Sequence, residues 1–257
     1  MTPPEAPPAD APDGLGLIET MRAVDGEVPL LHLHLARLGR SARALGFALD
    51  RGAVSRAVRD LARETTDAAS APAAFPAAAP TPLGLSPEAS GARLRLVLAR
   101  DGTFRLAAGP LAEAPWRTAA VYPEPLREAG TWRCIHKTTA RAHYNRALTW
   151  AEAHGVDEPL LVGARGHVVE GARSSVFVRE AGQLVTPPLA AGGLPGVMRA
   201  WLLENGAGER PLAPADLAGE VLLANAVRGL VPVRVVRPDA PRHRADPDAA
   251  NPGAPEA

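Results

Sequence analysis

The sequence predicts an α+β protein of two domains with a cleft between them. Strand-like alternation and helical periodicity mix in the first hundred residues and again in the second half of the chain. Between the halves lies the Pro-containing connection "APWRTAAVYPEP". We expect a disordered N-terminus (1–13), a small α+β domain (14–115, with a low-complexity Ala/Pro/Ser insertion at 65–92), a connection (116–126), a larger α+β domain (127–237) and a disordered tail (238–257).

The first half predicts a hairpin, two helices and a second hairpin. "LGLIETMRAVDGEVPLL" predicts two strands around the turn Val24–Glu27, where Asp-Gly is a strong hairpin signal. "HLHLARLGRSARALGF" is helical, because its apolar residues recur at spacings of three and four. A second amphipathic helix covers about 51–63, and "ARLRLVLARDGTFRLAAGP" predicts a hairpin around Asp101-Gly102.

The second half begins with a predicted helix at about 139–154, which ends at Gly155. A strand follows in "EPLLVGA", and "GHVVEGARSSVFVREAGQLVTPPL" predicts strands with a turn at Ala181-Gly182. "GGLPGVMRAWLLENG" is a glycine-rich loop leading into a helix, and "GEVLLANAVRGLVPVRVV" predicts strand, loop and strand.

Charge and composition exclude several classes of function. The net charge is zero, so nothing indicates a nucleic acid or an anionic membrane as partner. No apolar run approaches the roughly 20 residues that span a bilayer, and no segment resembles a signal peptide, so we expect a cytoplasmic protein. One cysteine and no zinc-ligand spacing leave no basis for a disulfide or a metal site.

One residue stands out against this composition. The chain has 27 arginines and a single lysine, Lys137, in "WRCIHKTTARAHYN". A chance survivor of a GC-rich codon bias is one explanation. The other is chemical, because a desolvated lysine can lose its proton, form a Schiff base and act as a base, whereas arginine stays charged. Lys137 lies just before a predicted helix, with Thr138 or Thr139 as candidate N-cap.

Three further features match the parts of a phosphate-bearing cofactor site. Glu170 lies within a strand, where a carboxylate is costly unless it pairs with a cationic nitrogen. The backbone N–H groups of Gly196 and Val197 begin a helix and would hold a phosphate. Arg37 lies on a polar helix stripe with His34 and Ser41, although such a stripe more often faces solvent. A surface glutamate and a tight connecting loop are the alternatives for the first two.

The order of these motifs resembles the fold-type IV pyridoxal phosphate (PLP) enzymes, which include branched-chain and D-amino-acid aminotransferases and 4-amino-4-deoxychorismate lyase. The resemblance covers about residues 15–236 without the insertion. It rests on "LIETMR", "LHLARLGRSARALGF", "HKTTARAHYNRAL", "GVDEPLLVGARGHVVEGARSSVFV", "LVTPPLAAGGLPGVMR" and "NAVRGLVPV".

This resemblance implies PLP as cofactor and a homodimer that acts on a small-molecule substrate. Lys137 matches the Schiff-base lysine and Glu170 the glutamate at the pyridine nitrogen. The residues that match the phosphate site are Arg37, Gly196, Val197, Asn225 and Ala226. Ser175 departs from the family, which usually has asparagine there.

Within the family, "IETMR" and "NAVRGLVPV" resemble the lyase. The resemblance therefore implies release of pyruvate from 4-amino-4-deoxychorismate to give 4-aminobenzoate for folate synthesis, with Thr20 helping to protonate the leaving group. Arg22, Arg141 and Arg228 are candidates for the substrate carboxylates. An aminotransferase acting on branched-chain or D-amino acids is the main alternative, and a non-catalytic relic of the fold is another.

Overall fold

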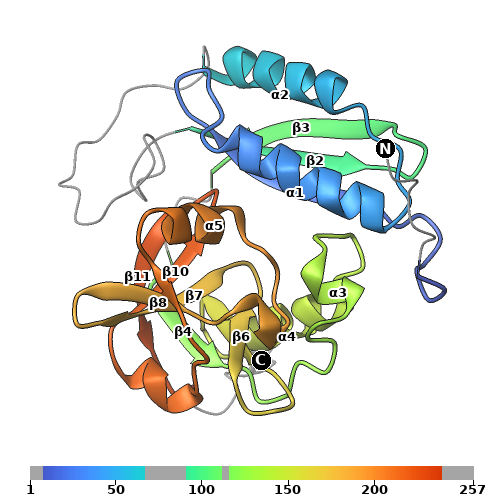
Figure 1. Ribbon diagram of the computed structural model, residues 1–257. Coiled ribbons are helices and arrows are strands. Elements are labelled where there is room, and N and C mark those ends of the chain that lie inside the picture. The colour runs from blue at the N-terminus through green and yellow to red at the C-terminus, as the bar shows by residue number, and fades with distance from the viewer. Residues whose placement is uncertain (1–7, 67–90, 112–115, 239–257) are drawn as a thin grey trace, which may run out of the picture.

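The computed structural model describes residues 8–66, 91–111 and 116–238. Within these residues the chain forms two α+β domains, one around a three-stranded sheet and one around an eight-stranded sheet (Figure 1). The two-domain α+β architecture predicted from the sequence is thereby confirmed. No helix among the described residues is long and apolar enough to cross a membrane.

The small domain is an antiparallel sheet covered on one face by two helices (Figure 1). Its strands are β1 (Leu17–Ala23), β2 (Ala92–Leu98) and β3 (Phe104–Pro110), in that order across the sheet. Helices α1 (Leu31–Ala44) and α2 (Arg51–Thr66) pack on it. The amphipathic patterns of the sequence explain this arrangement, because the apolar stripe of each helix packs on the apolar face of the sheet.

Strand β2 shows how the sequence positions the site. Leu94, Leu96 and Leu98 are fully buried under the helices. Side chains alternate along a strand, so Arg93 and Arg95 lie on the opposite face, toward the large domain. The same alternation on the neighbouring strand β1 places Thr20, which pairs with Arg95, on that face too.

The large domain is built on one mixed sheet in the order β6-β5-β4-β11-β10-β7-β8-β9. Helices α4 (Ala142–Ala153) and α5 (Val197–Glu204) pack against it, and a short helix α3 (Trp132–Ile135) precedes α4. The strands are β4 (Thr118–Val121), β5 (Glu158–Val162), β6 (Val168–Gly171), β7 (Ser175–Glu180), β8 (Gln183–Thr186), β9 (Gly208–Glu209), β10 (Val221–Asn225) and β11 (Gly229–Val235).

The structure corrects two local predictions. The first hairpin has no second strand: Val24 and Glu27 form an isolated bridge, and β1 pairs with β2 instead, because the chain enters α1 directly after Leu30. Neither Thr138 nor Thr139 is an N-cap, since α4 begins later, after Arg141.

Other predictions lie partly or wholly outside the described residues. These are the N-terminal segment before residue 8, most of the 65–92 insertion and the tail beyond residue 238. Residues 8–13 are described, and there Asp10 accepts hydrogen bonds from the Trp132 indole at 2.8 Å and from Arg133.

Candidate active site

A cavity of 370 Å³ lies between the two domains. β1, β2 and α1 of the small domain line one side of it. The other side comes from the segment before α4, from α4 itself, from the β6–β7 region, from the start of α5 and from the loop after β10. All the catalytic and cofactor-binding residues predicted from the sequence line this cavity: Lys137, Thr20, Glu170, Arg37, Gly196, Val197, Asn225 and Ala226.

Lys137 is carried by an extended segment that hydrogen-bonds to the edge of β1. The Ile18 N–H donates to the Lys137 carbonyl at 2.8 Å, and the Thr139 N–H donates to the Gly16 carbonyl at 2.9 Å. Ser41 of α1 and the His136 ring lie 3.0 Å apart. The backbone of the lysine is therefore fixed by both the sheet and the helix of the small domain.

The amino group of Lys137 has a lowered pKa. Lys137 is half-buried and lines the cavity, where loss of water around the amino group lowers its pKa to about 7. The cations Arg141 and Arg37 lower it further, whereas Glu19 and Glu170 act in the opposite direction. A large fraction of the amine is therefore neutral near pH 7, as a nucleophile or a base requires.

Glu170 is buried on β6 and points into the same cavity. Burial raises its pKa to about 7, although a hydrogen bond from the Tyr144 hydroxyl and another from the Leu194 N–H (3.0 Å) favour the charged form. The Cys134 thiol lies behind Tyr144, beside the His143 ring at 3.6 Å. A cationic ring nitrogen near Glu170 would stabilise the charged carboxylate. Pairing with such a nitrogen is the role that the sequence predicts for Glu170.

Arg37 does not face solvent. It makes a two-pronged ion pair with Glu19 of β1, with Nε–Oε1 and Nη2–Oε2 distances of 2.9 and 2.6 Å. His34 lies 2.7 Å from the same carboxylate through Nδ1, and Arg37 also donates to the Pro195 carbonyl at 3.3 Å. The polar stripe of α1 is therefore buried, and through Arg37 it contacts the loop before α5 in the other domain.

The N-terminus of α5 is open to an anion. Gly196 is the N-cap, and no side chain bonds to the first N–H groups of the helix. A Cβ on Gly196 would lie 2.6 Å from the Ser175 hydroxyl, so a larger residue at this position would displace the Ser175 side chain. Asn225 uses its side chain to fix the facing loop: its Oδ1 accepts from the N–H groups of Val227 (2.9 Å) and Arg228 (2.8 Å).

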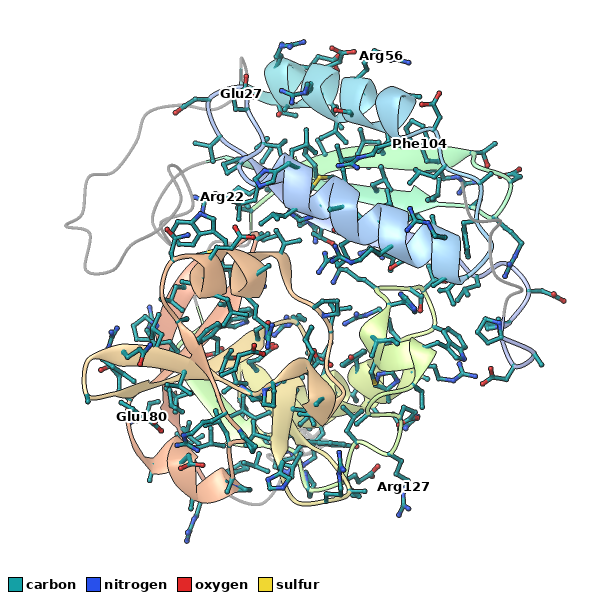
Figure 2. All side chains as sticks on the ribbon, in the orientation of Figure 1. Arg22, Glu27, Arg56, Phe104, Arg127 and Glu180 are labelled. Atoms are coloured by element: carbon teal, nitrogen blue, oxygen red, sulfur yellow. The ribbon has the colours of Figure 1, made fainter. Side chains whose placement is uncertain are left out.

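Four arginines line the mouth of the cavity without a carboxylate partner among the described residues. Arg141 and Arg228 were expected from the sequence, and the structure adds Arg93 and Arg95 of β2. Arg22 is buried at the domain boundary (Figure 2), where it donates to the Val227 carbonyl at 3.3 Å, and it does not line the cavity. The cavity mouth is therefore strongly cationic.

Sequence reasoning did not single out Glu19, Tyr144, Arg93 or Arg95. Period-two alternation in "LIETMRA" puts Glu19 on the same face as Leu17 and Met21, so a buried carboxylate in need of a cation could have been inferred. The alternation of arginine and leucine in "ARLRLVL" likewise indicates one cationic face. Tyr144 had no such signal, because its partner Glu170 is distant in sequence.

The residues present fit a phosphorylated aldehyde cofactor with a basic ring nitrogen. A neutral amine, a buried carboxylate and an uncapped helix N-terminus beside an arginine converge on one cavity. With two α+β domains around it, this cavity defines a PLP enzyme of fold type IV.

The chain belongs to the class IV aminotransferase family. Residues 16–236 match the sequence profile of that family, described as "Amino-transferase class IV". Members of the family use PLP, so PLP is the cofactor of this enzyme. A hypothetical aminotransferase from Mycobacterium tuberculosis solved with PLP bound shares the fold, at a TM-score of 0.72 and 22% identity over 89% of this chain and 84% of that one.

Relatives with higher identity include both lyases and aminotransferases by name. A protein of Schizosaccharomyces pombe, provisionally named an aminodeoxychorismate lyase, is 30% identical over 188 residues, or 71% of each chain. A provisionally named amino-acid aminotransferase from Mesorhizobium loti is 32% identical, with a TM-score of 0.70 over 86% of this chain and all of that one. A structure provisionally named 4-amino-4-deoxychorismate lyase is 30% identical, with a TM-score of 0.66 over 89% and 86%.

Proposed function

We propose that this enzyme is a 4-amino-4-deoxychorismate lyase, which releases pyruvate and forms 4-aminobenzoate for folate synthesis. The observation that carries the proposal is the cavity itself: an amine of lowered pKa and a hydroxyl line it together with four arginines that have no carboxylate partner among the described residues. That surplus of positive charge matches a substrate with two carboxylates. The names of two relatives at 30% identity support the same reading.

PLP, when bound, supplies an aldehyde carbon for the substrate amine and an electron-withdrawing ring. Lys137 provides the amine that holds the cofactor and, at its lowered pKa of about 7, can accept the proton from C4 of the substrate. Glu170 would keep the ring nitrogen protonated. Arg37 and the N–H groups of Gly196 and Val197 would hold the phosphate, together with Asn225 and Ala226.

Thr20 lines the cavity on β1, next to Arg95 on β2. In this proposal, its hydroxyl donates a proton to the three-carbon group that leaves C3. With Lys137 taking the C4 proton and the C3–O bond breaking, the ring becomes aromatic and the leaving group becomes pyruvate. Arg95 and Arg141 are our candidates for one substrate carboxylate, because the charge of Arg95 acts on Arg141 within the cavity.

An amino-acid aminotransferase is the second candidate, favoured by the Mesorhizobium loti relative at 32% identity. It would use the same Lys137 and Glu170 and differ in the fate of the substrate. The proposal also retains the expectations of a homodimer and of a cytoplasmic location. Light scattering of the purified enzyme tests the first.

The deciding experiment measures pyruvate release from 4-amino-4-deoxychorismate and amino transfer to 2-oxoglutarate, together with the visible spectrum with PLP. Wild type should show a visible cofactor band and release pyruvate, and Lys137→Ala should do neither. Lys137→Arg is a matched control that keeps the positive charge without a nucleophilic amine, and it should also fail. Amino transfer without pyruvate release would replace the lyase by the aminotransferase.

A further inference from the structure

Arg93 and Arg228 come from different domains and both line the mouth of the cavity. Arg93 lies on the cavity face of β2, and Arg228 lies on the loop between β10 and β11. Burial lowers the pKa of Arg228; the charge of Arg173 and, more weakly, that of Arg93 act in the same direction, whereas Glu158 and Asp157 oppose them. The two arginines therefore face one cavity from different domains.

Hydrogen bonds from both domains hold the loop that carries Arg228. The Asn225 side chain accepts hydrogen bonds from the backbone of Val227 and Arg228, and Arg22 reaches across from β1 to the Val227 carbonyl. The Arg228 guanidinium lies 4.9 Å from the centre of the Trp116 ring. Its position is thus fixed by the protein, so little ordering is required when a ligand binds.

Neither arginine has a carboxylate partner within the described residues. The charge of the buried Glu158 carboxylate acts on Arg228, but that carboxylate is bound by Arg173 at 2.8 Å and by the Ser174 hydroxyl at 2.9 Å. The Arg228 Nε has no hydrogen-bond partner among those residues although it is buried. Two arginines that line one cavity without a bonded carboxylate among the described residues indicate a site whose anion comes from the ligand.

A second pair of arginines repeats this arrangement. Arg95 lies two residues along β2 from Arg93, on the same face, and its charge acts on Arg141 of the large domain. Two residues along a strand correspond to about 7 Å. A carboxylate on a six-membered ring and another on a three-carbon ether side chain of that ring can span such a separation.

We propose that Arg93 and Arg228 form a subsite for a second carboxylate, through which the cavity selects dicarboxylates over monocarboxylates. The inference rests on the proposed function at one point: it identifies the second carboxylate as the one on the enolpyruvyl side chain. Arg95 and Arg141 then bind the ring carboxylate.

Binding to the PLP-loaded enzyme tests the proposal, with dissociation constants measured by calorimetry. The probes are chorismate, which has both carboxylates but a hydroxyl in place of the amine, 4-aminobenzoate, which has only the ring carboxylate, and 2-oxoglutarate, a dicarboxylate without a ring. Arg228→Gln and Arg93→Gln should each weaken chorismate about 10- to 100-fold, as loss of a charged hydrogen-bond partner does. Each should weaken 4-aminobenzoate less than threefold.

Two further variants keep the result interpretable. Arg228→Lys keeps the charge but not the forked geometry, so its loss of chorismate affinity should be intermediate. Arg127→Gln removes an exposed arginine far from the small domain (Figure 2) and should change nothing. An unchanged cofactor band and melting temperature in Arg93→Gln, which alters an exposed side chain, establish that the fold is intact.

The outcomes separate the subsite from the proposed function. Equal losses for chorismate and 4-aminobenzoate, or no loss for chorismate, would overturn the subsite and leave the lyase standing. Wild type that binds 2-oxoglutarate in an Arg228-dependent way but not chorismate would keep the subsite and overturn the lyase. Binding of neither dicarboxylate would overturn the subsite.

Discussion

Replacing Glu19 with glutamine removes the buried carboxylate that holds Arg37. Burial alone would raise the pKa of Glu19, but the charge of Arg37 and the hydrogen bond from His34 outweigh it and lower the pKa from 4.5 to about 2. At about 1.4 kcal/mol per pH unit, this difference corresponds to about 3 kcal/mol of folding free energy at pH 7. Breaking one side of a buried ion pair costs a similar amount, about 3–5 kcal/mol.

The assay is denaturant unfolding of the cofactor-free proteins as a function of pH. Because the folded pKa lies below the unfolded one, the contribution of Glu19 is complete above about pH 4.5 and is lost as the pH falls toward 2. The difference between wild type and Glu19→Gln should therefore be about 3 kcal/mol at pH 7 and about half that at pH 3. In melting temperature, the pH 7 difference is about 6–12 °C.

Glu27→Gln is the matched control. Glu27 (labelled in Figure 2) forms an exposed ion pair with Arg59 at 3.7 Å, which is worth less than about 1 kcal/mol. A second readout concerns the cofactor: Glu19→Gln should weaken PLP more than pyridoxal, which lacks the phosphate, because Arg37 loses its anchor. A stability difference below about 1 kcal/mol, or one independent of pH, would refute the reasoning.

Three other predictions concern single side chains. Glu170→Gln should make the cofactor-free protein more stable at pH 8 but not at pH 4. The pKa of Glu170 is about 7 in the folded protein and 4.5 in the unfolded chain, so its ionisation costs stability as the pH rises from 4.5 through 7. Lower stability of the variant at pH 8 in denaturant titrations would contradict this. Cys134 is buried, with a pKa raised to about 12, so a thiol reagent at pH 8 should label it only after denaturation, and rapid native labelling would show the packing to be wrong. Thr20→Val should lower kcat for pyruvate release about 100-fold with little change in PLP affinity, and Thr20→Ser should recover most of it; a fully active Thr20→Val would remove Thr20 from the chemistry.

The sequence by itself determined the class of fold, most of the elements and the family. Periodicity predicted α1, α2 and the β2–β3 hairpin, because amphipathic faces are a local property of the chain. The single lysine and the Gly-rich loop at the start of α5 also stand out without coordinates, and both line the cavity.

Only the tertiary structure decided which partners these residues contact. From the sequence alone, the polar stripe of α1 could face either water or a phosphate. In the structure, Arg37 bonds to Glu19 and to the Pro195 carbonyl and is buried. The predicted second strand of the first hairpin does not form, because β1 pairs along its whole length with β2, some 70 residues away. A local turn signal cannot anticipate a long-range strand that competes for the same edge.

The arginines illustrate the same limit. Among 27 arginines, composition cannot say which few share a cavity. The register of β2 with β1, and the packing of the β10–β11 loop against that sheet, bring Arg93, Arg95, Arg141 and Arg228 to one cavity. Arg93 and Arg228 are 135 positions apart and Arg95 and Arg141 are 46 apart, so the two domains must pack together before these residues share a site.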